Sequence, residues 1–327
     1  MSEAGKPDEL MDILFQNDCL RPIWRFFLCV VLFFGALVIS GEIVGTFLLA
    51  LGLHPTLPVL MFWQSLMSLL AVLAASKLMT VVFERRPLGS VGLAFHPRWW
   101  KELVRGLGVG AAMLSATVVL EWICGCARFT PSPHPTMRAG SFCFVLFAVA
   151  AVFEETVFRG YPFQRLIESI TPTGAVIVDG AFFGFVHLAN PHPTWISTLN
   201  TALVAIPMCI AYLRTHSLWM PIGMHLIWNF LMGFILGLPV SGITLPASFL
   251  TARVQGPVWL SGGDYGPEGG LLATVAILLV TVYLARAKSI YTSEEMKALV
   301  SAPERARMPE TPITIFSIPP EETGKRD

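Results

Sequence analysis

The sequence predicts an all-α polytopic membrane protein, with about eight transmembrane helices around a cavity that faces the cytoplasm. Three observations support this fold class. Hydrophobic residues make up 54% of the 327 residues and charged residues only 13%, with a mean hydropathy of +0.65, whereas soluble domains are about 25% charged. The apolar residues fall in runs long enough to cross a bilayer. The lysines and arginines gather in alternate connections between these runs.

Eight apolar runs are candidates for transmembrane helices. An α-helix rises about 1.5 Å per residue and the hydrocarbon core is about 30 Å thick, so a span needs roughly 20 apolar residues. The first run is too long for the apolar region of a cleaved signal peptide, so we expect it to remain as the first span. The runs cover residues 23–51, 58–82, 103–125, 141–165, 173–189, 196–213, 217–237 and 269–286.

The distribution of lysine and arginine orients these spans, because cytoplasmic loops carry an excess of basic residues. Only Arg128, Arg138 and Arg253 fall on the side that is poor in basic residues. The opposite side receives Lys6, Arg21, Arg25, Arg85, Arg86, Arg98, Lys101, Arg105, Arg165, Arg214, Arg286, Lys288, Lys297, Arg305 and Arg307. We therefore expect a multi-pass protein of the plasma or inner membrane, with both termini in the cytoplasm.

The chain divides into three parts by composition. Residues 1–20 form a polar cytoplasmic N-terminal segment, residues 21–288 form the transmembrane domain, and residues 289–327 form a cytoplasmic tail. The tail is rich in proline and charged residues and shows little periodicity, which predicts a mobile extension with one short helix near Ser293–Val300.

The charge balance, the cysteines and the glycines argue against several other classes of protein. The chain has 22 basic and 22 acidic residues, so it has no basic excess for a nucleic-acid partner. Its six cysteines include no Cys-x-x-Cys motif, and Cys124 and Cys126 are too close in sequence for an ordinary disulfide. We expect all six to be packing residues. Gly106, Gly108 and Gly110 follow no predicted strand, so we interpret them as small residues for close helix packing rather than as a nucleotide-binding loop.

The fourth run contains adjacent carboxylates in a setting where charge is costly. A charged side chain near the bilayer centre costs several kcal/mol, so it needs a partner or a function. Arg159 lies four positions after Glu155, so the two side chains share one helix face and can form an ion pair. Glu154 is rotated by about 100° from Glu155 and is left without this partner. The spacing therefore separates a structural carboxylate from a free one.

Two later runs add polar residues to apolar helices. His187 follows Phe183 by four positions in the fifth run, and Asn229 follows His225 by four positions in the seventh. Counted from the cytoplasmic ends of their runs, Glu154, His187 and His225 lie roughly 16, 21 and 12 Å deep. These three side chains can therefore share one cavity reached from the cytoplasm. Further acids in apolar runs, which we assign to packing, cavity lining or span ends, are Glu42, Glu121 and Asp179.

This set of side chains suits peptide hydrolysis, which needs a base for water, a stabiliser for the oxyanion and an acid for the leaving amine. Glu154 suits the base, and His187 can orient the water or share its proton. His225 and Asn229 offer N–H donors to the oxyanion. A zinc site is an alternative, because Glu154, His187 and His225 make a carboxylate and two imidazoles, although the His-Glu-x-x-His spacing is absent. A structural role also stays open, since an intramembrane histidine often makes a hydrogen bond between helices.

The three motifs together resemble the CPBP family, which contains CAAX proteases and bacteriocin-processing (Abi) proteins. The family pattern is Glu-Glu-x-x-x-Arg, then Phe-x-x-x-His, then His-x-x-x-Asn. The matching segments here are Glu154-Glu155-Thr-Val-Phe-Arg159, Phe183-Gly-Phe-Val-His187 and His225-Leu-Ile-Trp-Asn229. The clear similarity covers residues 145–235.

The resemblance implies an eight-helix membrane fold with a cavity open to the cytoplasm and to lipid. It implies that Glu154 and His187 activate water, and that His225 and Asn229 hold the oxyanion. It leaves the need for zinc open. The residues that it implies as supports of this site are Glu155, Arg159 and Phe183.

The resemblance also implies a substrate, a peptide or protein associated with the lipid bilayer. The alternative is a non-catalytic membrane scaffold or a bacteriocin-immunity protein that uses the same cavity for binding. An ion-coupled carrier is a third alternative, and the lack of inverted repeats counts against it.

Overall fold

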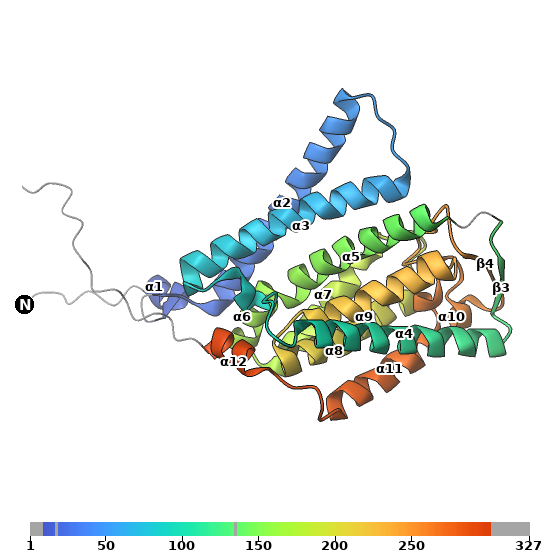
Figure 1. Ribbon diagram of the computed structural model, residues 1–327. Helices are drawn as coiled ribbons and strands as arrows, with labels where there is room; N and C mark the ends of the chain where they lie inside the picture. The colour runs from blue at the N-terminus through green and yellow to red at the C-terminus, as the bar shows by residue number, and fades with distance from the viewer. Residues whose placement is uncertain (1–8, 17–18, 134–135, 302–327) are drawn as a thin grey trace, which may run out of the picture.

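Long apolar helices run side by side between two ends of the molecule, one with strands β3 and β4 and the other with helices α1 and α12 (Figure 1). The computed structural model describes residues 9–16, 19–133 and 136–301. The helices that form the bulk of the molecule are α2 (Pro22–Ala50), α3 (Leu57–Met79), α4 (Trp99–Ile123), α5 (Met137–Arg159), α7 (Pro172–Val186), α8 (Trp195–Thr215), α9 (Trp219–Phe230) and α11 (Leu271–Arg286). The shorter helices are α1 (Glu9–Leu14), α6 (Tyr161–Ser169), α10 (Val258–Ser261) and α12 (Glu294–Ser301).

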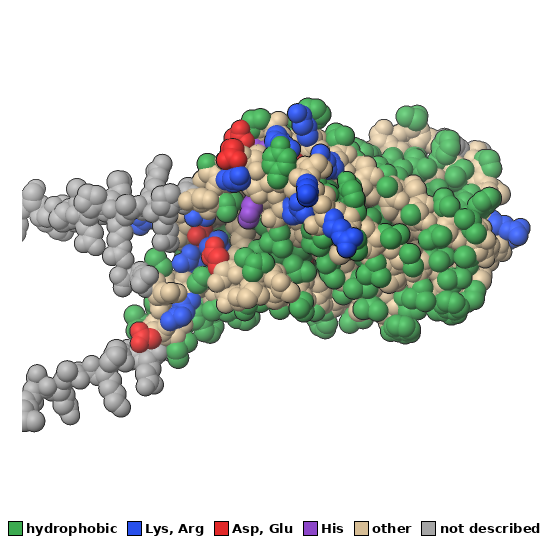
Figure 2. All heavy atoms as spheres, turned by 90° about the horizontal axis from the view of Figure 1, so that it is seen from below, with side chains coloured by type: hydrophobic (Ala, Val, Ile, Leu, Met, Phe, Trp, Pro, Cys, Tyr) green, Lys and Arg blue, Asp and Glu red, His purple; other side chains and the backbone are tan. Residues whose placement is uncertain are grey.

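Each of the eight predicted runs overlaps one of the long helices, and the all-α polytopic fold class is confirmed. Within the described residues, 6 helical segments are long and apolar enough to cross a membrane. Two further apolar segments are shorter, Trp219–Ile235 and Leu271–Arg286, so the count of eight spans stays a prediction. Figure 2 shows hydrophobic side chains over most of one face, with the lysines and arginines gathered mainly in a band toward the α12 end.

Threonine side chains begin three of the helices at the expected N-cap position. Thr136, Thr171 and Thr194 have extended backbones, and the side-chain oxygen of each accepts a hydrogen bond from the backbone N–H three residues later. These bonds satisfy N–H groups that have no partner within the helix. The first turns of α2, α3 and α7 contain proline, which lacks the N–H that a first turn leaves unused.

The fourth predicted span is not one continuous helix. It breaks at Gly160, where α5 ends and α6 begins, and Pro162 lies in the first turn of α6. Proline interrupts a helix because it has no N–H for the carbonyl four residues earlier and its ring clashes with that carbonyl. A Cβ atom at Gly160 would lie 2.3 Å from the Thr156 carbonyl oxygen, so only glycine fits this turn. The break allows the Tyr161 hydroxyl to donate to Glu84 Oε1 at 3.0 Å.

A small antiparallel sheet joins two loops that are distant in sequence. Strand β3 (Ala127–Pro131) follows α4, and strand β4 (Leu250–Val254) lies in the loop between α9 and α10. Helix α9 continues into a π-helical segment, Leu231–Ile235, before this loop. A second short sheet, made of β1 (Phe15–Gln16) and β2 (Cys19–Leu20), precedes α2. No pattern in the sequence predicts either sheet.

The chain after α11 folds back onto the ends of α4 and α8. Arg105 Nη1 donates to the Ser289 carbonyl at 2.7 Å, and Arg214 Nη2 donates to the Ile290 carbonyl at 3.0 Å. Met296 in α12 is fully buried. A short helix is thus present near the predicted position, and residues 302–327 of the predicted tail lie outside the described residues.

Helices α4 and α9 approach each other closely through glycine. A Cβ atom at Gly106 would lie 2.2 Å from the Met220 carbonyl oxygen, and one at Gly110 would lie 2.5 Å from the Met224 carbonyl oxygen. Gly108, between them, has nothing within 4 Å of such an atom. The predicted packing role therefore applies to Gly106 and Gly110, which face α9, and not to Gly108.

We expect Gly106→Ala to destabilise the protein by about 1–3 kcal/mol, because the added methyl group meets backbone that cannot move without separating the helices. Gly108→Ala is the matched control, and it should be neutral or stabilising by about 0.5–1 kcal/mol because alanine is the better helix former. Denaturation midpoints of the purified variants in detergent measure both effects. Equal midpoints for the two variants would contradict the packing role.

Candidate active site

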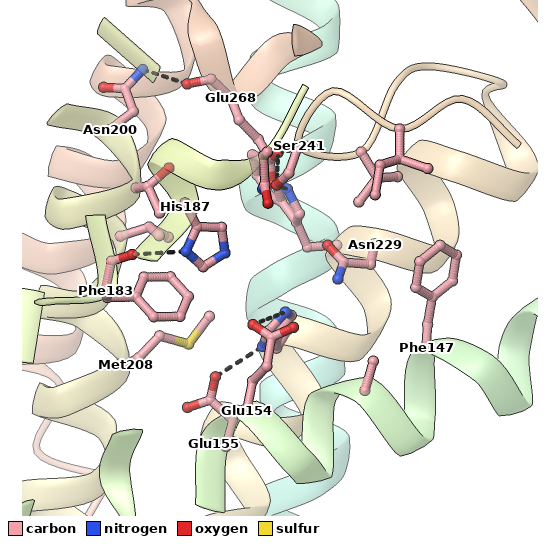
Figure 3. Close-up of a pocket in the computed structure, with 18 of the residues that line it drawn as sticks. Phe147, Glu154, Glu155, Phe183, His187, Asn200, Met208, Asn229, Ser241 and Glu268 are labelled. Carbon is pink, nitrogen blue, oxygen red and sulfur yellow. Dashed lines mark hydrogen bonds and ion pairs between the residues drawn. The ribbon is translucent and has the colours of Figure 1, made fainter. Parts of the chain in front are cut away.

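A cavity of about 190 Å³ lies among the long helices and the loops at the β3–β4 end. Glu154 and Glu155 of α5, His225 and Asn229 of α9, and His187 line it. Figure 3 shows Glu154, His187 and Asn229 directed toward the same space. The structure therefore brings together the four side chains that the sequence analysis proposed as catalytic. Its apolar lining includes Leu146, Phe147, Phe183, Met208 and Ile277.

A buried guanidinium lies beside this cavity. Arg159 is fully buried, with Nη1 3.4 Å from Glu155 Oε1 and Nε 3.2 Å from Asp179 Oδ2. The guanidinium carbon is 4.5 Å from the centre of the Phe183 ring, within the range of a cation–π contact. Cys209 Sγ donates to Asp179 Oδ2 at 3.2 Å. The predicted ion pair between Glu155 and Arg159 is present, and Asp179 is its third member.

His225 lies between the two adjacent glutamates. Its Nδ1 is 2.9 Å from Glu155 Oε1, and its Nε2 is 3.8 Å from Glu154 Oε2. A carboxylate paired with Arg159 accepts hydrogen bonds, so Nδ1 of His225 is the donor. Glu154 thus has an imidazole neighbour. The spacing of residues along α5 predicted no partner for it, because such spacing relates residues of one helix and His225 belongs to α9.

The two glutamates differ sharply in exposure. The Glu154 side chain is 27% exposed, whereas that of Glu155 is 0% exposed. Glu155 is held by Arg159 and His225, and Glu154 faces the cavity. Only Glu154 is therefore open to water and to a bound molecule.

His187 presents one ring nitrogen to the cavity. It lies just beyond α7, and its Nδ1 is 2.7 Å from the Phe183 carbonyl oxygen four residues earlier. Because a carbonyl oxygen only accepts, Nδ1 donates the proton, and Nε2 is left with the lone pair in the neutral ring. The Phe183 ring lies against the imidazole with 4.5 Å between ring centres. Phe183 thus orients His187 through both its carbonyl group and its ring.

The metal alternative does not fit this geometry. Zinc requires three protein ligands within about 2.0–2.3 Å of one point. Among the side chains that the structure describes, no group of three or more His, Cys, Asp or Glu residues could hold a metal ion. Glu154, His187 and His225 are therefore not arranged as a set of zinc ligands.

A third glutamate, which the sequence analysis did not single out, lines the cavity. Glu268 Oε1 accepts from Trp228 Nε1 at 2.9 Å, and Oε2 accepts from the backbone N–H and the hydroxyl of Ser241, both at 2.7 Å. Asn200 Nδ2 donates to the Glu268 carbonyl at 2.9 Å. These bonds join α8, α9 and two loops at the end of the cavity away from Glu155 (Figure 3). In the sequence, Glu268 and Asp264 are both acids in the same glycine-rich segment, so no pattern distinguishes Glu268 as a residue of the site.

The other acids within apolar runs lie elsewhere. Glu121 is buried, with its Oε1 unpaired within the described residues, and neither it nor Glu42 lines the cavity. Glu42 is exposed on α2. The assignment of Glu42 and Glu121 to packing or span ends stays a prediction.

We expect Asp179→Asn to destabilise the protein by about 3–5 kcal/mol, because neutralising one partner of a buried ion pair leaves its charge under-compensated. Asp264→Asn makes the same chemical change at an exposed loop position and serves as the matched control. The denaturation midpoint in detergent is the measurement. A midpoint for Asp179→Asn equal to that of Asp264→Asn would show that Arg159 does not depend on Asp179.

Comparison with known proteins identifies one family. Residues 138–231 match the family model described as Rce1-like, Type II CAAX prenyl endopeptidase Rce1-like. The matched segment contains Glu154, Glu155, His187, His225 and Asn229. No curated protein and no solved structure matches the chain. Residues 138–231 are therefore similar to the Type II CAAX prenyl endopeptidases, in agreement with the resemblance that the three motifs carry.

Proposed function

We propose that the protein is an intramembrane endopeptidase that hydrolyses a peptide bond in a membrane-associated peptide or protein. The observation that carries the proposal is Glu154, a partly exposed carboxylate beside the imidazole of His225, in a largely apolar cavity that His187 also lines. The family description names a prenyl endopeptidase, so a prenylated CAAX peptide is the first substrate to test. The predicted orientation places Arg128 and Arg253 of the β3–β4 end away from the cytoplasm, and the loops that line the cavity lie at that same end.

Glu154 is the general base in this mechanism. It takes a proton from water as the water oxygen attacks the carbonyl carbon of the scissile bond. Its exposure within the cavity supports this role, because a base must reach the proton that it accepts. Nε2 of His187 has a lone pair available toward the cavity, so it can accept a hydrogen bond from the same water and orient it.

The amide of Asn229 and the doubly protonated imidazole of His225 stabilise the oxyanion, with the Nε2–H of His225 as a donor while its Nδ1–H is bonded to Glu155. Both side chains come from one face of α9 and line the cavity, and donors held in place before the reaction stabilise a developing charge most effectively. The bond from His225 to Glu155 fixes the ring, and Arg159 fixes Glu155. The role of Glu155 and Arg159 is therefore to position His225, without contact with the substrate.

The second half of the reaction returns the proton. The tetrahedral intermediate collapses, the C–N bond breaks, and protonated Glu154 donates its proton to the leaving amine. The products are a carboxylic acid and an amine, the acid then passes its proton to the amine to give a carboxylate and an ammonium group, and Glu154 ends as the carboxylate with which it began. One side chain thus serves first as base and then as acid.

We expect Glu154→Gln to lower the rate of cleavage by about 10²–10⁴-fold, because glutamine cannot accept the proton of water. The measurement is the release of a fluorescent fragment from a peptide in liposomes that contain the purified protein, with prenylated and unprenylated peptides compared. Glu42→Gln makes the same change at an intramembrane position outside the cavity and should cleave at the parental rate.

A Glu154→Gln protein that cleaves as fast as the parent would rule out Glu154 as the base. A parent that binds the peptide without cleaving it would favour the scaffold alternative, in which the cavity serves for binding alone.

A further inference from the structure

Two segments distant in sequence lie side by side near the α12 end of the molecule. Residues 98–105 begin α4, and residues 284–291 end α11 and continue beyond it. Helices α4 and α11 pack together, and the bond from Arg105 Nη1 to the Ser289 carbonyl joins the two segments at 2.7 Å. The side chains of both segments therefore lie at the same height along the axes of the packed helices.

These two segments are strongly and almost exclusively basic. They contain five cationic residues, Arg98, Lys101, Arg105, Arg286 and Lys288, and a single acid, Glu102. Glu102 is buried, and its Oε2 lies 3.2 Å from His96 Nε2. The only carboxylate of the two segments is therefore directed inward and cannot neutralise the exposed cations.

Four of these cations form a surface that we call the basic patch: Lys101, Arg105, Arg286 and Lys288. Lys101, Arg286 and Lys288 are exposed, and within the described residues none of the three makes an ion pair. Lys101 and Arg105 are four positions apart on α4, which places them on one helix face. Arg105 is half-buried and keeps its remaining donors beyond the bond to Ser289.

The surroundings of the basic patch are those of a membrane interface. Trp100 is 50% exposed beside Lys101, whose Nζ lies 5.4 Å from the indole centre, and Tyr283 is 50% exposed on the last turn of α11. Leu278, Leu279 and Val282 of the same helix are also exposed. Figure 2 shows the band of basic side chains bordered by hydrophobic surface. Tryptophan and tyrosine concentrate at the level of lipid headgroups.

We propose that the basic patch binds the phosphate of an anionic phospholipid in the leaflet at the α12 end. A lipid fits better than a soluble acidic partner, because the cations border an apolar helix face that lipid chains cover. A bound phosphate would join α4 to the segment after α11 through charges on both, next to the bond from Arg105 to Ser289. This site is separate from the cavity, and the proposal does not depend on peptidase activity.

The test compares lipid binding by the full-length parent and two charge-matched variants. Each protein is placed in nanodiscs of phosphatidylcholine alone or mixed with phosphatidylglycerol, and bound phosphatidylglycerol is counted by native mass spectrometry. Each basic residue near an anionic surface strengthens attraction about fivefold, so Lys101→Gln/Lys288→Gln should bind roughly 25-fold more weakly. The control is Arg128→Gln/Arg253→Gln, which removes two exposed charges from paired positions of β3 and β4 and should bind like the parent.

Equal loss of phosphatidylglycerol binding in both variants would overturn the proposal, because binding would then depend only on the total charge of the protein and not on the basic patch. Binding of free glycerol phosphate as tightly as phosphatidylglycerol would also overturn it, since the site would then not require the lipid. If Lys101→Gln/Lys288→Gln does not fold, the parent alone decides the question. Its bound phosphatidylglycerol must fall as salt rises, because exposed charge pairs are screened within about 10 Å at 0.1 M ionic strength.

Discussion

The buried guanidinium of Arg159 is the constraint on which the arrangement of the central helices depends. An arginine in an apolar interior needs opposite charge nearby, because the free energy of removing it from water is large. Glu155 on the same helix supplies one carboxylate and Asp179 on α7 supplies the other. Glu155 then binds His225 of α9. One cation therefore fixes α5, α7 and α9 relative to one another, and these helices bear three of the four proposed catalytic side chains.

The same constraint divides two neighbouring glutamates between different tasks. Glu155 is paired with Arg159 and His225 and is closed to solvent, whereas Glu154 points into the cavity. At the opposite end of the cavity, Glu268 is a fixed acceptor for Trp228 and Ser241. Trp228 precedes Asn229 on α9, so Glu268 stabilises the helical turn that presents the Asn229 amide. The proposed site is thus supported from both ends by carboxylates that do not take part in the chemistry.

Much of this arrangement was accessible from the sequence, because it rests on periodicity within single helices. The apolar runs predicted the helices, and the spacing of four predicted the pairs Glu155–Arg159 and His225–Asn229. Contacts between helices were not accessible. Nothing in the sequence connected Asp179 to Arg159, since 20 residues and a change of direction separate them.

Local geometry limited the prediction in other places. Hydropathy is continuous across the fourth run, so it conceals the turn at Gly160. The strands β3 and β4 have five residues each and pair with segments that lie more than a hundred positions away, which leaves no local signal. Glu268 acts through loop contacts that carry no periodic pattern.

The close contact between α4 and α9 has a consequence for the order of assembly on the ribosome. α4 ends at Ile123 and α9 begins at Trp219, and at typical synthesis rates the roughly 100 residues between them take about 5–20 s to produce. During this interval the glycine face of α4 has no partner, whereas Glu155 and Arg159 emerge within one helical turn of each other. The ion pair of Glu155 and Arg159 can therefore form before α4 meets α9. When α9 is made, it brings His225 to Glu155. The backbone of α9 then packs against Gly106 and Gly110.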